Sequence, residues 1–443
     1  MIRTILLIVI FIMVLPSAVQ SQDESMHEMH DSSQMQMPQT SATHHMPGMK
    51  MPISGNPIGI PLSRHGSGTS WLPDSTPMYG VMQHSGEWQL MYHGAAFLTY
   101  DQMNGARGDN KLVFNNWAMA NGYRRLNPRS DLRLSAMISI EPLTVGGAGY
   151  PLLFQTGETW RGEPLKDHQH PHNYFSELSA NYTQSLTKDS AALAYFAPVG
   201  EPAFGPVTYL HRTIGLDNPL APIGHHWQDV THISFWVATA GYETRKWKLD
   251  ASVFNGREPG ENRFAFQSPA FDSLSGRISY NPNADLALEA SYAFLNSPEQ
   301  LHPEDDIHRT DISATYNRAI TPHRNFEATF IWARNRVNKQ DLDGYLIEAQ
   351  LKQDGGWTPF FRYEFIKKNA EELVLPSSFP PQQIFNVQQA TIGITRDIFN
   401  TGSLTWAMGG AALFNVVPSD LKPVYGNNPM GWLIYLRIHA KRM

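Results

Sequence analysis

A short stretch near the N-terminus concentrates the two residue types that bind soft and borderline metal ions. Seven of the 18 Met residues of the chain lie in it, interspersed with His. Its candidate ligands are Met26, His27, Met29, His30, Met35, Met37, His44, His45, Met46, Met49 and Met51. Thioether sulfur prefers Cu(I) or Ag(I), whereas imidazole also binds Cu(II), zinc and nickel. The mixture predicts a copper cofactor, as Cu(I) or Cu(II), that is not tightly bound.

The composition of this stretch argues against a packed structure. Ser, Gln, Asp, Thr and Pro dominate it, and branched aliphatic and aromatic residues are almost absent. Such a segment cannot bury a core, so we expect it to be disordered. Met usually fills gaps in cores, and its concentration here therefore favours metal binding over an ordinary polar linker that carries some His.

A second group of His residues lies further along the chain. In the run from Asp167 to His172, alternate residues are His, and an extended chain would place them on one side. A later loop contributes more His, one of them at the entrance of the next strand. The candidate metal ligands of the two loops are His168, His170, His172, His225, His226 and His232. A pH-sensitive constriction and a hydrogen-bonded network that pins the loops remain alternatives.

An enzymatic function is a further possibility. Some outer-membrane proteins hydrolyse lipids with Ser, His and an orienting partner. Here Ser176 with His172, or Ser234 with His232 and Asp229, would be the candidates. No motif surrounds either group, so we expect that the protein is not an enzyme and has no catalytic residues.

The first residues have the pattern of a secretory signal peptide. Arg3 precedes an apolar run from Ile5 to Leu15, and Pro16, Ser17 and Ala18 follow. The run is too short to span a membrane as a helix. We expect cleavage after Ser21. The chain has no Cys, which excludes disulfides, Cys-ligated metals and attachment of lipid to an N-terminal Cys.

The rest of the chain is predicted to be all-β. Several stretches alternate apolar and polar residues over a length that can cross a bilayer as a tilted strand, about 9 to 11 residues. One of them sets Leu132, Leu134 and Ala136 against Asp131 and Arg133. We expect the apolar face to contact lipid and the polar face to line the lumen of an antiparallel transmembrane β-barrel.

The pattern gives about sixteen strands, with fourteen to eighteen possible. They are expected at 87–100, 112–122, 131–141, 174–184, 191–198, 231–243, 246–255, 273–280, 284–295, 308–318, 325–335, 343–352, 357–367, 386–397, 403–416 and 431–440. Short and long connections alternate between them, as in bacterial outer-membrane barrels. A soluble sandwich or propeller would not require this alternation.

These features divide the chain into three parts. We expect a signal peptide at 1–21, a disordered Met/His-rich segment and linker in the periplasm at 22–78, and an outer-membrane barrel at 79–443. The repeated Gly-Glu-Pro at 162–164 and 200–202 predicts tight turns that order the long loops. The formal net charge of −6 makes nucleic acid an unlikely partner.

The combination of signal peptide, Met/His-rich segment and barrel resembles the copper-resistance protein B family. The resemblance is specific from Met26 to Met51 and architectural over residues 80–443. The runs at 162–164, 200–202 and 255–259 also resemble uncharacterised outer-membrane proteins.

The resemblance implies copper tolerance, by sequestration or by transport of copper across the outer membrane. Outer-membrane lipid, metal ions and periplasmic copper-handling proteins are the implied partners, and a homo-oligomer is possible. The alternative is a general diffusion porin or a transporter of another small solute, which a barrel of this width would also suit.

Overall fold

The computed structural model describes residues 55–229 and 233–443. The chain divides after Met51, and Pro52–Met443 forms the second unit. The described residues all belong to the second unit. The predicted signal peptide and the Met/His-rich stretch from Met26 to Met51 lie outside them.

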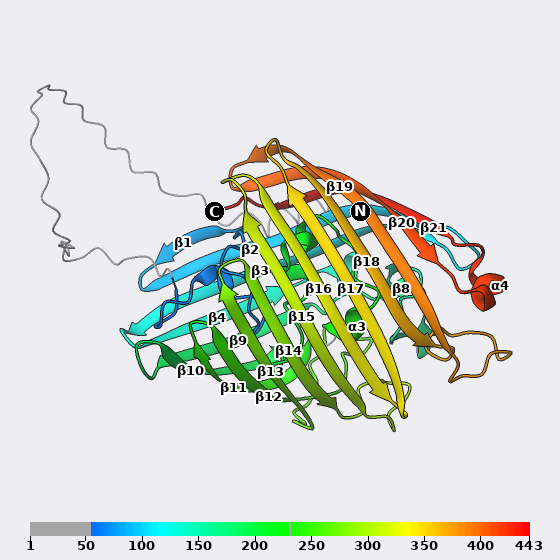
Figure 1. The fold of residues 1–443 in the computed structure, drawn as a ribbon, viewed down its shortest axis with the longest axis horizontal. Coiled ribbons are helices and arrows are strands. Elements are labelled where there is room, and N and C mark those ends of the chain that lie inside the picture. Colours follow the sequence, from blue (N-terminus) through cyan, green and yellow to red (C-terminus); the bar gives the residue numbers. More distant parts are fainter. Residues whose placement is uncertain (1–54, 230–232) are drawn as a thin grey trace, which may run out of the picture. The chain divides into compact units, whose positions relative to one another are not determined.

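A closed antiparallel barrel of sixteen strands makes up most of the second unit. Its sheet has 17 strands, of which β1 (Val81–Ser85) pairs only with the start of the next strand. The other strands are β2 (Trp88–Met103), β3 (Asn110–Asn127), β4 (Ser130–Ile138), β9 (Phe175–Ser185), β10 (Ser190–Gly200), β11 (Ser234–Thr244), β12 (Trp247–Phe254), β13 (Ser273–Asn283), β14 (Leu286–Leu295), β15 (Ile307–Ala319), β16 (Asn325–Val337), β17 (Gln340–Lys352), β18 (Trp357–Asn369), β19 (Ile384–Thr401), β20 (Leu404–Val416) and β21 (Met430–Ala440). Each pairs with its neighbours in chain order, and β21 pairs with β2 to close the ring (Figure 1).

The sequence prediction of an all-β barrel with sixteen strands is confirmed, and each expected strand matches one in the structure. The differences are a few residues at the ends. For example, β3 and β19 extend beyond their predicted ranges at both ends. The strands are longer because pairing with one neighbour continues past the point where side chains alternate in polarity.

Side chains alternate between the lumen and the outside along every long strand. On β21, Leu433 is 1% exposed and Ile434 is 57% exposed. On β4, Leu134 is 42% exposed, whereas the neighbouring Arg133 is buried. The outer surface is therefore a band of exposed apolar side chains, which is the surface that lipid requires. Among the described residues, no helix has both the length and the apolar character needed to cross a membrane.

The connections define two ends of the barrel. The links at 128–129, 186–189, 245–246, 284–285, 320–324, 353–356 and 402–403 are short and form the short-turn end. The links at 104–109, 139–174, 201–233, 255–272, 296–306, 370–383 and 417–429 form the long-loop end. The predicted alternation of short and long connections holds except at the link 338–339, which lies at the long-loop end and has only two residues.

The fold also has several small elements. One of them, η1 (Leu62–Arg64), precedes the barrel, and the long connections carry the rest. The others are α2 (Glu141–Thr144), β5 (Tyr150–Pro151), β6 (Glu158–Trp160), β7 (Glu163–Leu165), β8 (His168–Gln169), η2 (Tyr209–His211), η3 (Thr213–Leu216), α3 (His225–Gln228), η5 (Ser419–Leu421) and α4 (Lys422–Tyr425). The strand β5 pairs with β8, and β6 pairs with β7.

The described residues of the connection at 201–233, which are 201–229 and 233 and which we call the luminal loop, cross the interior of the barrel. Arg277 on β13 donates to the Gly205 carbonyl at 3.0 Å, near the start of the loop. Arg437 on β21 contacts Asp217 further along it. The loop thus reaches inner walls that are far apart in the ring of strands. This agrees with the expectation, drawn from the Gly-Glu-Pro turns, that the long loops are ordered.

Residues 55–80, which we call the luminal segment, also lie against the inner wall. The Asn56 amide donates to Glu243 on β11 at 2.6 Å, and the Thr69 hydroxyl donates to Asp250 on β12 at 2.6 Å. Ile58 and Ile60 are buried against Trp71.

Here the structure differs from the expectation of a linker up to residue 78. The polar composition of residues 55–78 resembles that of a linker. However, a wide barrel lined with charged groups offers their backbone and side chains many hydrogen-bonding partners.

Candidate functional site

Two loops bring the candidate site together inside the long-loop half of the barrel. The β4–β9 loop (139–174) contributes His170, and the luminal loop contributes His225 and His226. Both loops are held by side chains of other elements. Such support gives the imidazoles fixed positions, which a metal site needs.

The helix α3 positions two of the three imidazoles. It is a single turn, and its Gly224 N-cap backbone N–H donates to the Glu364 carboxylate on β18 at 3.1 Å. Trp227 in the same turn is buried, with the Lys368 ammonium 5.8 Å from its ring centroid. These contacts anchor the turn to the barrel wall and leave His225 and His226 on its inner side.

His170 follows β8 and is fixed by its own backbone. Its Nδ1 donates to the Pro171 carbonyl at 3.0 Å. Its Nε2 therefore carries the lone pair and lies 3.5 Å from a Glu158 carboxylate oxygen. A ring whose Nδ1–H is held by a carbonyl presents Nε2 as a ligand, which is the arrangement that metal-binding His residues favour.

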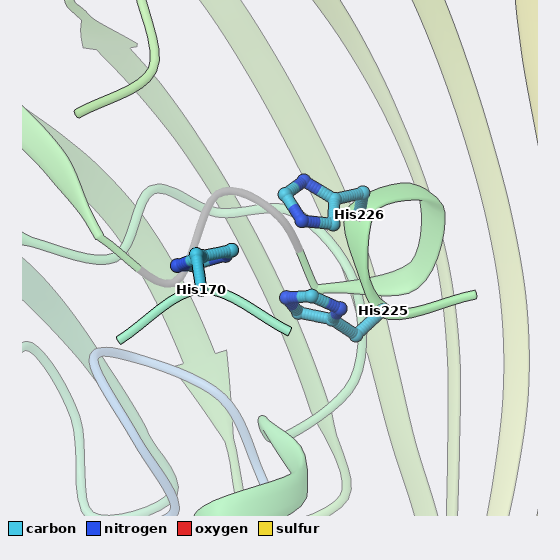
Figure 2. Close-up of side chains that lie close together, drawn as sticks. All are labelled: His170, His225 and His226. Carbon is cyan, nitrogen blue, oxygen red and sulfur yellow. The ribbon is translucent and has the colours of Figure 1, made fainter. Parts of the chain in front are cut away.

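The three imidazoles converge, as Figure 2 shows. One ligand nitrogen from each of His170, His225 and His226 lies within 4.8 Å of the other two, and all three side chains are buried. The ring centroids of His225 and His226 are 4.1 Å apart. Nitrogen ligands of one tetrahedral metal ion are about 3.4 Å apart. Side-chain adjustments of about an ångström would complete such a site.

Two carboxylates extend this group. Glu158, His226 and Glu258 also place one ligand atom each within 4.8 Å of one another. Arg263 pairs with Glu158 at 2.8 Å, and Arg309 lies 3.5 Å from Glu258. The two guanidiniums hold the carboxylates in place while no cation is bound. His226 belongs to both groups of ligands and so joins them into one cluster.

Burial sets the protonation of the cluster. Burial, together with the positive charge of Arg263, holds the pKa of His170 well below its usual value. Burial raises the pKa of Glu158 and of Glu258, although Arg263 and Arg309 oppose the change. His170 is therefore neutral, which is the form that binds metal ions. A cation in the cluster would also favour the ionised form of both carboxyls.

An acidic cavity adjoins the cluster. It has a volume of about 420 Å³ and is lined by Glu158 and Trp227. Its other acidic residues are Glu163, Glu299, Asp305, Glu371 and Glu372. Carboxylates that surround a cavity raise the local concentration of cations. The cavity provides space and charge for a cation next to the imidazoles.

The other loop His residues predicted as ligands lie apart from the cluster. His172 contacts the Glu141 carboxylate through Nδ1 at 2.7 Å and the Tyr209 hydroxyl through Nε2 at 3.2 Å. His168 lies near the surface, 3.5 Å from Asp109. His232 lies outside the described residues. The alternative of a hydrogen-bonded network therefore describes His172.

The hydrolase candidates do not form a nucleophile–base pair in the described residues. The Ser176 hydroxyl donates to the Asn173 carbonyl at 3.2 Å, and both nitrogens of His172 have the partners given above. The second candidate includes His232, outside the described residues.

Sequence reasoning missed Glu158, Glu258 and the acidic cavity. Glu258 lies in the run at 255–259, which was noted only for its resemblance to other proteins. Isolated Glu residues in loops are common, and only the fold shows which of them face a His. The run at 255–259, which contains Glu258, and the run at 162–164, which follows Glu158, were the available signal.

Comparisons with known proteins identify the fold. No family model matches the chain, and no curated protein matches it. Among solved structures, OmpF of Salmonella typhi in complex with daunomycin has a TM-score of 0.51 and 11% identity, covering 81% of this chain and 100% of that chain. An anion-selective porin of Comamonas acidovorans has a TM-score of 0.48 and 10% identity over 80% of this chain and 100% of its own. OprB of Pseudomonas putida has a TM-score of 0.46 and 11% identity over 79% and 94%.

At such identities the likeness to OmpF shows a porin-type barrel fold and nothing finer. The resemblance to the copper-resistance protein B family therefore stays a prediction.

Proposed function

We propose that this chain is a non-enzymatic barrel of the bacterial outer membrane that binds copper and contributes to copper tolerance by sequestering or transporting the ion. The convergence of His170, His225 and His226 from two separate loops carries this proposal. Hydrogen bonds from Gln155 and Gln169 of the β4–β9 loop to the His225 ring already join the two loops, at 3.0 and 3.4 Å. Three imidazoles that converge in this joint have the residue types and spacing that suit a metal ion.

Three further features support metal handling in the barrel. The adjoining cavity is acidic, as expected for a route that admits cations. The apolar band outside the barrel and the porin-type fold support the outer membrane as its place. The Met/His composition from Met26 to Met51 supports copper over zinc, because thioethers prefer Cu(I). In this proposal that stretch captures copper in the periplasm, and the cluster of His170, His225 and His226 holds it during retention or passage.

Metal content after purification tests the proposal. The full chain is folded in detergent, offered copper, zinc and silver together, and assayed for bound metal. We expect His170→Ala/His226→Ala to lose one equivalent of copper relative to the unmodified chain. The matched control is His168→Ala/His323→Ala, which removes two His residues outside the cluster. Equal copper in both variants, or an exclusive loss of zinc, would overturn the assignment.

A general diffusion porin is the second candidate, and the fold shared with OmpF favours it. It predicts large ion conductance through single barrels in planar bilayers, unchanged by copper. The copper-binding proposal predicts a conductance that falls when copper is added, because the ion would bind inside the lumen.

A further inference from the structure

A second, distinct cavity lies among the luminal segment, the luminal loop and the wall near the start of β2. Its volume is about 100 Å³. Three Met and three His side chains line it: Met78, Met91, Met119, His65, His93 and His211. None of them belongs to the His170 cluster, and none lies in the stretch from Met26 to Met51.

Four chain segments deliver these side chains. Met91 on β2 and Met119 on β3 project from adjacent strands of the inner wall and are buried. Met78 and His65 come from the luminal segment, and His211 from η2 of the luminal loop. Inner walls of wide barrels are usually polar. Thioethers on this wall, facing imidazoles from two inserted segments, are therefore a departure that packing against lipid does not explain.

An indole ring forms another part of the cavity wall. Trp117 on β3 lies with its ring centroid 4.9 Å from that of His211 and 5.3 Å from that of His93. The face of an indole attracts cations, most strongly when water is excluded. The His93 ring is oriented by the Asn121 side chain at 3.0 Å.

The charges around the cavity discriminate between kinds of cation. Among the residues that the structure describes, no carboxylate lines it. A hard divalent ion such as calcium or magnesium requires oxygen ligands and would gain little there. The two lining guanidiniums have partners: Arg133 donates to the Gly68 carbonyl at 2.5 Å, and Arg212 pairs with Glu348. A soft ion with a single charge suits this environment best.

We propose that this cavity is a binding site for a soft monovalent metal ion, Cu(I) or Ag(I), with thioether and imidazole ligands. Met91 and Met119 supply sulfur from the wall, and His65, Met78 and His211 supply ligands from the inserted segments. Thioether sulfur selects monovalent copper and silver over zinc. The site goes beyond the proposed function, because it uses other residues and lies in the opposite half of the barrel.

A silver titration of the full chain tests the proposal. The variant Met91→Leu/Met119→Leu keeps side-chain volume and so should fold. The matched control is Met103→Leu/Met137→Leu, which replaces two buried wall residues that do not line the cavity. We expect the first variant to bind one fewer equivalent of Ag(I) than the control in competition with a soft chelator. The stretch from Met26 to Met51 is identical in both proteins and cancels in the comparison.

Tryptophan emission gives an independent readout. Binding of Ag(I) beside Trp117 should quench a fraction of the emission, and this step should be missing in Trp117→Phe and in Met91→Leu/Met119→Leu. Heat-modifiable gel mobility checks that both double variants are folded. Equal silver content in the two folded variants would overturn the proposal. So would a quenching step that Trp117→Phe retains. Both results are independent of copper binding at His170, which neither variant changes.

Discussion

Arg212 and Glu348 form a buried ion pair in the barrel interior, with Arg212 Nε 2.5 Å from a Glu348 carboxylate oxygen. Arg362 on β18 approaches the other oxygen of Glu348 at 2.9 Å. Arg362 also donates to the Leu220 carbonyl at 2.7 Å. One wall carboxylate is thus shared by a guanidinium of the wall and one of the luminal loop. This arrangement ties the loop to the wall at Arg212 and at Leu220.

Arg212→Met should release this tie. It leaves Glu348 buried with one cationic partner, and removal of one member of a buried pair costs about 3 to 5 kcal/mol. We expect a lower free energy of unfolding and an increase of single-channel conductance in planar bilayers. Arg336→Met is the control, because the pair of Arg336 with Asp341 is exposed. Unchanged conductance with normal folding would show that the loop does not restrict the lumen.

Trp71→Ala should detach the luminal segment. Trp71 is buried and lies between two cations, with Arg64 and Lys248 each 4.8 Å from its ring centroid. Loss of a buried Trp typically costs 3 to 5 kcal/mol. We expect protease cleavage within residues 55–80 of the folded variant, which the unmodified chain resists. Trp247→Ala, on the exposed side of β12, should leave the segment protected, and cleavage in both variants would argue against specific docking.

Glu299→Gln should stabilise the fold in alkaline solution. Burial and the negative charge of Glu372 raise the pKa of Glu299 to about 6. The folded chain therefore binds this proton more tightly than the unfolded chain, and the stability so gained is complete below about pH 4.5 and lost as the pH rises through 6. Because Glu299 is half-buried, we expect a gain on the order of 1 kcal/mol at pH 8 and none at pH 4.

Denaturant unfolding of the two proteins at both pH values checks this prediction. Glu304→Gln, in the exposed part of the same loop, is the control. An equal gain at pH 4 and pH 8 would contradict the role of the ionised Glu299.

His172→Ala should lower the stability of the fold without lowering its copper content. His172 lies in the same run as His170, but its nitrogens contact Glu141 and Tyr209. We expect this variant to lose stability, about 1 to 3 kcal/mol for the buried partners left behind, and to keep its copper content. Copper assays and unfolding curves of His172→Ala beside His170→Ala check this contrast. A loss of copper in His172→Ala would place His172 among the ligands.

The strands could be predicted from the sequence because lipid and the lumen impose opposite demands on alternate residues. Leu134 is exposed on the outer surface and the adjacent Arg133 is buried on the inner side, and the other strands repeat this alternation. The ends of strands were less certain, since pairing extends β3 and β19 beyond the alternating residues.

The interior could be predicted only in part. The spacing of His168, His170 and His172 indicated a functional loop, but not that the chain direction changes between them. His168 meets Asp109 and His172 meets Glu141, so only His170 reaches α3. The luminal segment was missed for a related reason. Its burial depends on charged groups of distant strands, such as Glu243 and Asp250, which no local pattern reveals.

The most direct test of the central claim is electron paramagnetic resonance of the full chain saturated with Cu(II), so that sites in the stretch from Met26 to Met51 and in the barrel interior are both filled. Hyperfine structure counts the nitrogens that bind the ion. We predict a signal from three imidazoles that loses nitrogen couplings in His225→Ala/His226→Ala and is unchanged in His168→Ala/His323→Ala. An identical signal in all three proteins would place the copper elsewhere in the chain and contradict a metal site in the barrel interior.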